Sequence, residues 1–118
     1  MSRLTPDDLD RDFVEVHLSD FGVWVTVYPF DLTTGAVGTT GTKCQALPRP
    51  IRTRLVMAPD GGAVAVSERR WHLRAYQLTG ITLTEGAEIA EADGTRWAVE
   101  SHELMGFGTR SVCETHKV

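Results

Sequence analysis

Two groups of residues near the C-terminal end have side chains that could support chemistry. In the first, CETH places Cys113 and His116 at a zinc-like spacing, and Cys44 could lie nearby. A structural zinc ion normally takes four ligands from two such pairs, and this chain offers one pair. We therefore predict no metal site, with both cysteines packed as small apolar residues and His116 in solvent.

The second group is Glu100, His102 and Glu103, whose side chains are of the types used in general acid–base catalysis. Adjacent residues of a strand point to opposite faces, so only Glu100 and His102 are expected to share a side. We expect that side to face solvent, whereas catalytic groups need a cleft and a tuned environment. The sequence also lacks Gly-x-Ser-x-Gly, a phosphate-binding loop and His-Glu-x-x-His. We therefore predict a protein that is not an enzyme and binds no cofactor.

Basic residues are concentrated in one part of the sequence, in the run RPIRTR and in the later pair RR. The arginines are Arg49, Arg52, Arg54, Arg69 and Arg70. They could contact phosphate or an acidic partner, or they could simply keep a turn soluble. The net charge of the chain is −4, from 12 Lys and Arg against 16 Asp and Glu. This balance argues against a general nucleic-acid binder, whose surface is basic.

The totals describe one ordinary globular domain spanning residues 1–118. Hydrophobic residues make up 42% and charged residues 24% of the chain, as in soluble proteins. No apolar run approaches the ~18 residues that a membrane span needs, and MSRLTPDDLD has no apolar core of the signal-peptide kind. We predict a protein that stays in the cytoplasm, with no membrane partner.

The first element is predicted to be a helix over about 6–20, ended by Gly22. Thr5 can cap it, Pro6 suits the first helical position, and two aspartates follow in the first turn. Leu9, Phe13 and Val16 would share one helical face. The rival interpretation is a strand, since alternate residues from 14 to 18 are also apolar.

The rest of the chain alternates strand patterns with turn signals. Strands are predicted at 23–28, 42–47, 63–67, 70–78 and 109–116 and in a hairpin over 89–101, with long loops at 29–41 and 48–62. In 70–78, Trp71, Leu73 and Ala75 would be buried, while Arg74 and Tyr76 would face water. About six short strands and one helix predict a mainly β fold, a small antiparallel sandwich or barrel.

The hairpin IAEADGTRWAVES allows two registers around Asp93 and Gly94. A two-residue turn would put Ile89 and Trp97 on opposite faces of the sheet. A three-residue loop with Gly94 at positive φ would pair them, and would gather Ile89, Trp97 and Val99 on one buried face. Burying a large side chain is worth ~1.5–3 kcal/mol, so we predict the second register, with Trp97 as a core anchor.

The C-terminal half resembles the head–tail joining, or head-closure, proteins of tailed bacteriophages and prophages. The strand RRWHLRAYQL, the connector TGITLTEG, the hairpin and a last strand TRSVCETH follow that family's order. Six residues occupy the positions of its hairpin motif: Gly86, Ile89, Asp93, Gly94, Trp97 and Val99. The acid of the family's Gly-Asp pair falls one residue later here. The N-terminal helix leading into FGVWVTVYP also fits, whereas 29–62 does not align, so the likeness covers about half the chain.

The resemblance implies a structural virion protein that assembles in host cytoplasm. Copies would form a ring under the portal and its adaptor, close the filled head and dock tail or tail-terminator proteins. DNA would only pass through, and the acidic balance fits, because a cationic channel wall would retain DNA. Loops would make the contacts, and we predict interface roles for Phe30, Asp31, Arg49, Arg52, Arg54 and Met57.

The alternative is a small cellular β-barrel that binds a ligand or a nucleic acid on one face. Trp24, Tyr28 or Tyr76 would stack on the bound molecule, as aromatic residues do in single-strand binders. Arg74 and Tyr76 would lie together on one strand face and add positive charge to it.

Overall fold

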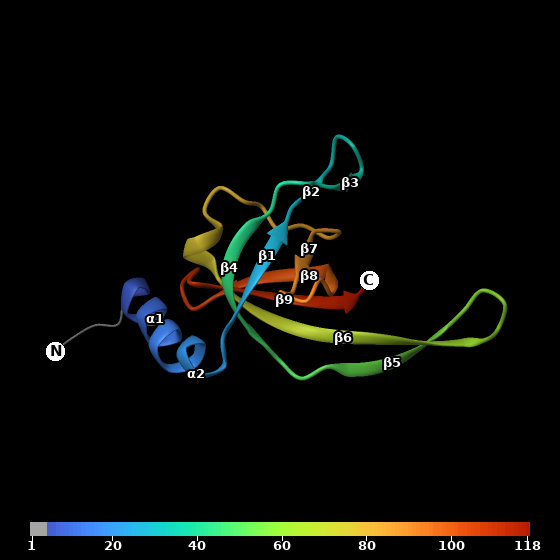
Figure 1. The fold of residues 1–118 in the computed structure, drawn as a ribbon, viewed down its shortest axis with the longest axis horizontal. Coiled ribbons are helices and arrows are strands. Elements are labelled where there is room, and N and C mark those ends of the chain that lie inside the picture. The colour runs from blue at the N-terminus through green and yellow to red at the C-terminus, as the bar shows by residue number, and fades with distance from the viewer. Residues whose placement is uncertain (1–4) are drawn as a thin grey trace.

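The computed structural model describes residues 5–118 and shows a small antiparallel β-barrel with two appendages (Figure 1). A helix lies at one end of the barrel and a two-stranded arm extends from the other. The molecule measures 61 × 31 × 25 Å, and its radius of gyration of 15.6 Å exceeds the ~13 Å of a compact domain of this length. Within the described residues, no helix is both long enough and apolar enough to cross a membrane.

The predicted N-terminal helix is confirmed, and the strand alternative for this segment is wrong. It runs as α1 (Pro6–Asp12), a π-helical segment η1 (Phe13–Leu18) and α2 (Ser19–Phe21). The Thr5 hydroxyl accepts the Asp8 N–H at 3.2 Å, and the Asp8 carboxylate accepts the Thr5 N–H at 3.0 Å, so two free backbone donors are satisfied. Phe13 and Leu18 are buried and hold the helix on the barrel.

Gly22 ends the helix with an extended backbone, and no side chain fits at that position. Its N–H donates to the Leu18 carbonyl at 2.9 Å. A Cβ atom would lie 2.4 Å from the Leu18 carbonyl oxygen, although the φ of −76° suits any residue.

We therefore expect Gly22→Ala to lower the free energy of unfolding by about 1–3 kcal/mol, through overpacking. Urea unfolding followed by circular dichroism measures this loss. Gly38→Ala is the matched control, because its Cβ would only touch the Pro29 carbonyl oxygen at 3.4 Å. Equal losses in the two variants would contradict the steric explanation.

Six antiparallel strands close the barrel, which confirms the predicted fold class. Their order is β4-β1-β7-β8-β9-β6, and pairing of β4 with β6 completes the circle. The strands are β1 (Val23–Tyr28), β4 (Thr42–Pro48), β6 (Ala63–Arg74), β7 (Glu88–Ala90), β8 (Arg96–Met105) and β9 (Arg110–Lys117). Closure leaves these strands few free edges.

The predicted strands at 63–67 and 70–78 are one strand, and the predicted loop at 48–62 contains another. β6 runs unbroken for 12 residues, and β5 (Arg52–Met57) pairs with its first half from Arg52↔Glu68 to Met57↔Ala63. The prolines at 48 and 50 favoured a loop here. Pro48 is the last residue of β4 and Pro50 lies in the link that follows, so neither proline falls within β5. After Arg74 the chain forms a short 3-10 helix, η2 (Ala75–Leu78), so Ala75 and Tyr76 are not strand residues.

The other predicted loop, 29–41, also contains structure. β2 (Phe30–Asp31) pairs with β3 (Ala36–Val37) in a short hairpin that projects from the barrel (Figure 1). The Asp31 carboxylate accepts the Thr33 N–H at 2.9 Å and so stabilises the turn. The sequence pattern did not reveal this hairpin, because the segment is rich in Thr and Gly and two paired residues per strand are too few to produce an apolar alternation.

The barrel interior is filled around two tryptophans. Trp71 of β6 and Trp97 of β8 meet edge to face, with ring centroids 6.5 Å apart. Residues from all six strands surround them: Val25, Val27, Cys44, Ala46, Leu73, Ile89, Val99 and Cys113. Packing of this kind needs neither a metal nor a disulfide, and both cysteines are free.

The predicted hairpin register is confirmed. Ile89 pairs with Trp97, Gly94 has φ +93°, and the Glu91 N–H donates to the Thr95 carbonyl at 2.8 Å across the three-residue loop. Ile89, Trp97 and Val99 are buried together on the core side. Asp93 accepts the Thr95 N–H at 2.9 Å, which fixes the loop.

Candidate assembly surfaces

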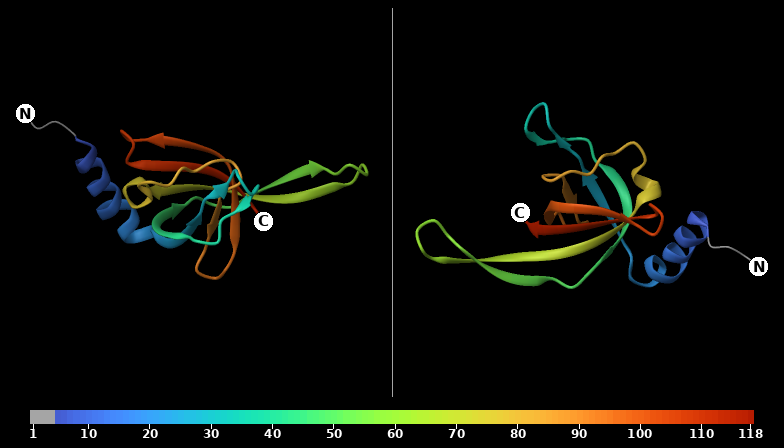
Figure 2. Two further views of the ribbon diagram at one scale, coloured as in Figure 1. Left: turned by 90° about the horizontal axis from the view of Figure 1, so that it is seen from above. Right: turned by 180° about the vertical axis from the view of Figure 1, so that it is seen from behind.

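The β5–β6 arm, residues 52–68, extends along the long axis of the molecule, and beyond its base it stands clear of the barrel (Figure 2). Its tip is a tight turn, in which the Ala58 N–H donates to the Gly62 carbonyl at 2.7 Å and Gly61 has φ +89°. The sequence signal for it is Asp-Gly-Gly between two apolar runs. An isolated two-stranded ribbon is at best marginally stable in water, so the arm depends on its attachment to the barrel.

One face of the arm continues the core-facing side of β6. Residues directly opposite in the ladder share a face, so Leu55 lies with Ala65, and Met57 with Ala63, on the side that carries Trp71 further along β6. Within the barrel this side is covered, whereas on the arm Leu55 and Met57 are each 72% exposed. The core surface of one strand thus extends into solvent as an apolar face with no cover in the described chain.

The opposite face of the arm carries charge near its base, where it joins the arm to the barrel wall, and two exposed valines, Val56 and Val64, further out. Arg54 forms ion pairs with Glu68 and, at 4.0 Å, with Glu100, while Arg52 lies 3.7 Å from Glu114. These pairs are largely exposed and so contribute little individually, ~0–1 kcal/mol each. Two of them link the base of the arm to β8 and β9.

The predicted interface residues fall into two places. Arg52, Arg54 and Met57 lie on the arm, and Arg49 lies at its base, where its N–H donates to the Arg70 carbonyl at 2.9 Å. Phe30 and Asp31 lie apart from them in the β2–β3 hairpin. The Phe30 ring packs over Gly86, where an added Cβ would lie 2.8 Å from it.

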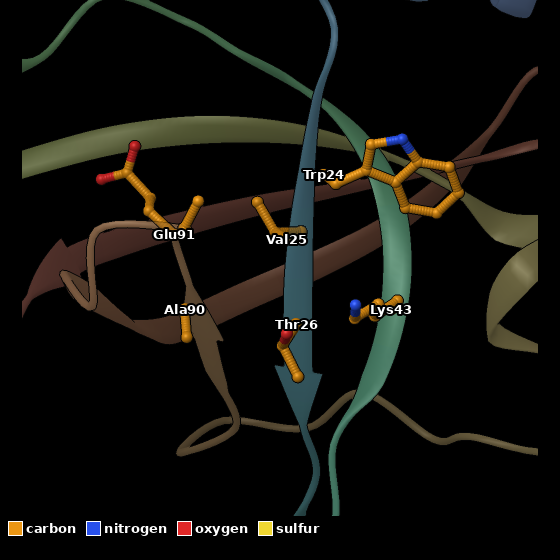
Figure 3. A pocket seen from close by; sticks show the side chains of 7 residues that line it. Trp24, Val25, Thr26, Lys43, Ala90 and Glu91 are labelled. Atoms are coloured by element: carbon orange, nitrogen blue, oxygen red, sulfur yellow. The ribbon is translucent and has the colours of Figure 1, made fainter.

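A groove lies where β1 loses its neighbour on one side. β7 pairs with β1 only from Thr26 to Tyr28, so Val23 to Val25 have no strand beside them there. The opening has a volume of about 490 Å³ and is lined by Trp24, Val25, Thr26, Lys43, Ala90, Glu91 and Ala92. Figure 3 shows β1 crossing it, with Lys43 on one side and Ala90 and Glu91 on the other. We call it the Trp24 groove, since that side chain is 54% exposed.

A polar cluster shares Glu91 with the groove. The guanidinium carbon of Arg69 lies 5.4 Å from the Trp71 ring centroid and 5.5 Å from that of Trp97. Glu91 accepts the Trp97 Nε1–H at 2.9 Å and lies 3.4 Å from the Arg69 guanidinium. Arg69 therefore faces the core side of β6 and is largely covered, and grouping it with its exposed neighbour Arg70 in one basic surface was wrong. Adjacent strand residues point to opposite faces.

The alternative binding face is not assembled as predicted. The Arg74 guanidinium donates to both oxygens of the buried Asp10, at 3.0 and 2.8 Å, and the Tyr76 hydroxyl donates to Asp7 at 2.9 Å. Both side chains thus attach the N-terminal helix. Tyr28 is covered by the Arg96 guanidinium, 4.4 Å from its ring centroid.

The predicted sharing of one side by Glu100 and His102 is wrong, because the ladder shifts register between Val99 and Ser101. His102 pairs with the buried Cys113, whereas Glu100 lies 2.9 Å from His116 on the outside. A bulge adds one residue to a strand and reverses the side on which the following residues lie. His116 and Cys113 also lie on opposite faces. In residues 5–118, no three His, Cys, Asp or Glu side chains are grouped so as to hold a metal ion.

Burial raises the pKa of Cys44 to about 11 and that of Cys113 to about 12, because the thiolates would be desolvated. In the unfolded chain the pKa of a thiol is near 9. The buried neutral thiols therefore favour the folded state fully below pH 9, and this contribution to stability is lost as the pH rises from 9 toward the pKa values of the folded state. Between about pH 8 and 10, the free energy of unfolding should fall by about 1–3 kcal/mol more than in Cys44→Ala/Cys113→Ala. Urea unfolding at both pH values measures this difference. An equal change in the free energy of unfolding in the natural protein and in the double variant would contradict the prediction.

No protein-family model and no curated protein sequence matches the chain.

Proposed function

We propose that the protein is a structural subunit of the neck of a tailed bacteriophage. In this proposal its copies form a ring that joins the portal and adaptor of the filled head to the tail. The β5–β6 arm carries the proposal, because a core-type apolar face stands uncovered at the end of a molecule 61 Å long. Covering a large apolar side chain is worth ~1.5–3 kcal/mol, so the arm favours assembly with a neighbour.

Two further observations support a ring over a ligand-binding module. An arm that docks on a different surface of the next subunit, without a reciprocal contact, is heterologous, and such a contact closes into a ring when the rotation between subunits fits. The arginines of the arm are paired with Glu68, Glu100 and Glu114, so they offer little free charge to a polyanion. An acidic molecule with neutralised arginines would line a passage without retaining DNA.

Inactivation of the gene in its phage or prophage tests the proposal. Electron microscopy of the particles should show full heads without tails, and a complementing copy of the intact gene should restore tailed virions. Normal virions from the inactivated strain would overturn the proposal. Failure of the complementing copy would do the same, because the defect would then belong to a neighbouring gene.

A further inference from the structure

We infer that the β5–β6 arm of one copy docks in the Trp24 groove of the next copy. The inference rests on the proposed ring and deepens it, since it names the partner as a second copy of this chain and the contact as arm to groove. The apolar arm face would pack against Trp24, and Asp60 at the arm tip would face Lys43 at the groove.

The arm supplies an apolar face and an acidic tip. Leu55 and Met57 are each 72% exposed on the face that continues the barrel core. Asp60 lies in the turn beyond them, where its side chain accepts the Gly62 N–H at 2.9 Å. It makes no ion pair within the described residues, so its charge is available to a partner.

The groove supplies the complement of both features. Trp24, Ala90 and Ala92 give it apolar walls. Of its two charged residues, Glu91 is already bound by Arg69 and by the Trp97 indole. Lys43 is exposed and forms no ion pair among residues 5–118, which leaves one positive charge beside an apolar opening. An apolar face with one acidic tip matches such a site.

The direction of the arm makes the contact intermolecular. Figures 1 and 2 show the arm leaving the barrel along its long axis, away from β1, so a chain does not fill its own groove. Each copy then presents one arm to one neighbour and receives an arm from the other. This head-to-tail arrangement is the geometry that a ring requires.

Reversing the charges of Asp60 at the arm tip and Lys43 at the groove, singly and together, tests the contact in the purified protein. Sedimentation velocity up to about 1 mM protein at low salt measures the dissociation constant of self-association. Lys43→Asp and Asp60→Lys should each raise it about tenfold, because each places like charges together. The double variant should return to within about threefold of the natural protein. Lys117→Asp, an exposed change outside the groove, is the matched control and should have no effect.

Apolar variants test the same contact independently. Met57→Glu on the arm and Trp24→Ala in the groove should each weaken self-association at least tenfold, on the order expected for central interface residues. Phe107→Ala removes a ring that is 78% exposed in the β8–β9 turn, so it is the control and should leave association unchanged. Circular dichroism confirms that each variant is folded.

Two results would overturn the inference: a natural chain that stays monomeric up to about 1 mM, or a double charge variant no better than the single ones. The experiments distinguish failure of this inference from failure of the proposed function. Tailless heads with a failed charge exchange would reject this contact and retain the neck role. Normal virions with a working exchange would retain the contact and reject the neck role.

Discussion

Replacing Trp97 by alanine is expected to lower the free energy of unfolding by about 3–5 kcal/mol. Trp97 is 1% exposed, pairs with Ile89 across the hairpin and meets Trp71 edge to face. The substitution would leave a cavity in the barrel centre and would remove the indole N–H that binds Glu91. Urea unfolding monitored by circular dichroism measures the loss.

Trp24→Ala is the matched control, since it removes the same side chain from a position that is 54% exposed. Its cost should stay within about 0.5 kcal/mol, as for most surface changes. Similar losses in the two variants would show that Trp97 is not the anchor of the core. The comparison also separates stability from assembly, because Trp24→Ala is expected to affect self-association alone.

The second large effect is expected from Arg74→Leu, at about 3 kcal/mol. Asp10 is 5% exposed, and the Arg74 guanidinium donates to both of its carboxylate oxygens. Without Arg74, a buried carboxylate would remain with no opposite charge, and undocking of the helix would return it to water. Hydrogen exchange should therefore accelerate over 6–21 before it does so in the barrel strands.

Two variants act as controls for this ion pair. Arg11→Leu removes an exposed arginine that lies 3.9 Å from Asp8 on the same helix, and should change stability by less than about 1 kcal/mol. Asp10→Leu/Arg74→Leu removes both charges and should recover part of the loss, because no unpaired ion is left behind. A double variant as unstable as Arg74→Leu would contradict the role of the buried charge.

Local patterns were sufficient wherever neighbours in sequence decide the structure. The helix start depends on Thr5 and Asp8, three residues apart, and its end on contact between Gly22 and Leu18. The hairpin at 89–99 follows from one glycine and from the segregation of apolar side chains. In each case the interacting groups are close in the chain, so type and spacing carry the information.

Long-range pairing was hidden wherever it overrode a local signal. The prolines at 48 and 50 and the Pro- and Gly-rich turn at 58–62 concealed β5, which forms because it can pair with β6. A pattern of alternating residues assigned Glu100 and His102 to one side, until the bulge beside Ser101 reversed it. The same limit placed Arg69 with Arg70, although only Arg69 points at Trp71 and Trp97.

The sequence by itself determined a mainly β fold, a small sandwich or barrel, with an N-terminal helix, the register of one hairpin and Trp97 in its core. The choice of a barrel depends on the pairing of β4 with β6, which closes the sheet. Apolar periodicity and turn residues are local, and they constrain the chain before it folds. Only the tertiary structure decided that β6 extends beyond the barrel, that an apolar face of the arm is exposed and that β1 borders an open groove. Those features depend on which strands become neighbours and where each pairing stops, and no short stretch of sequence records that choice.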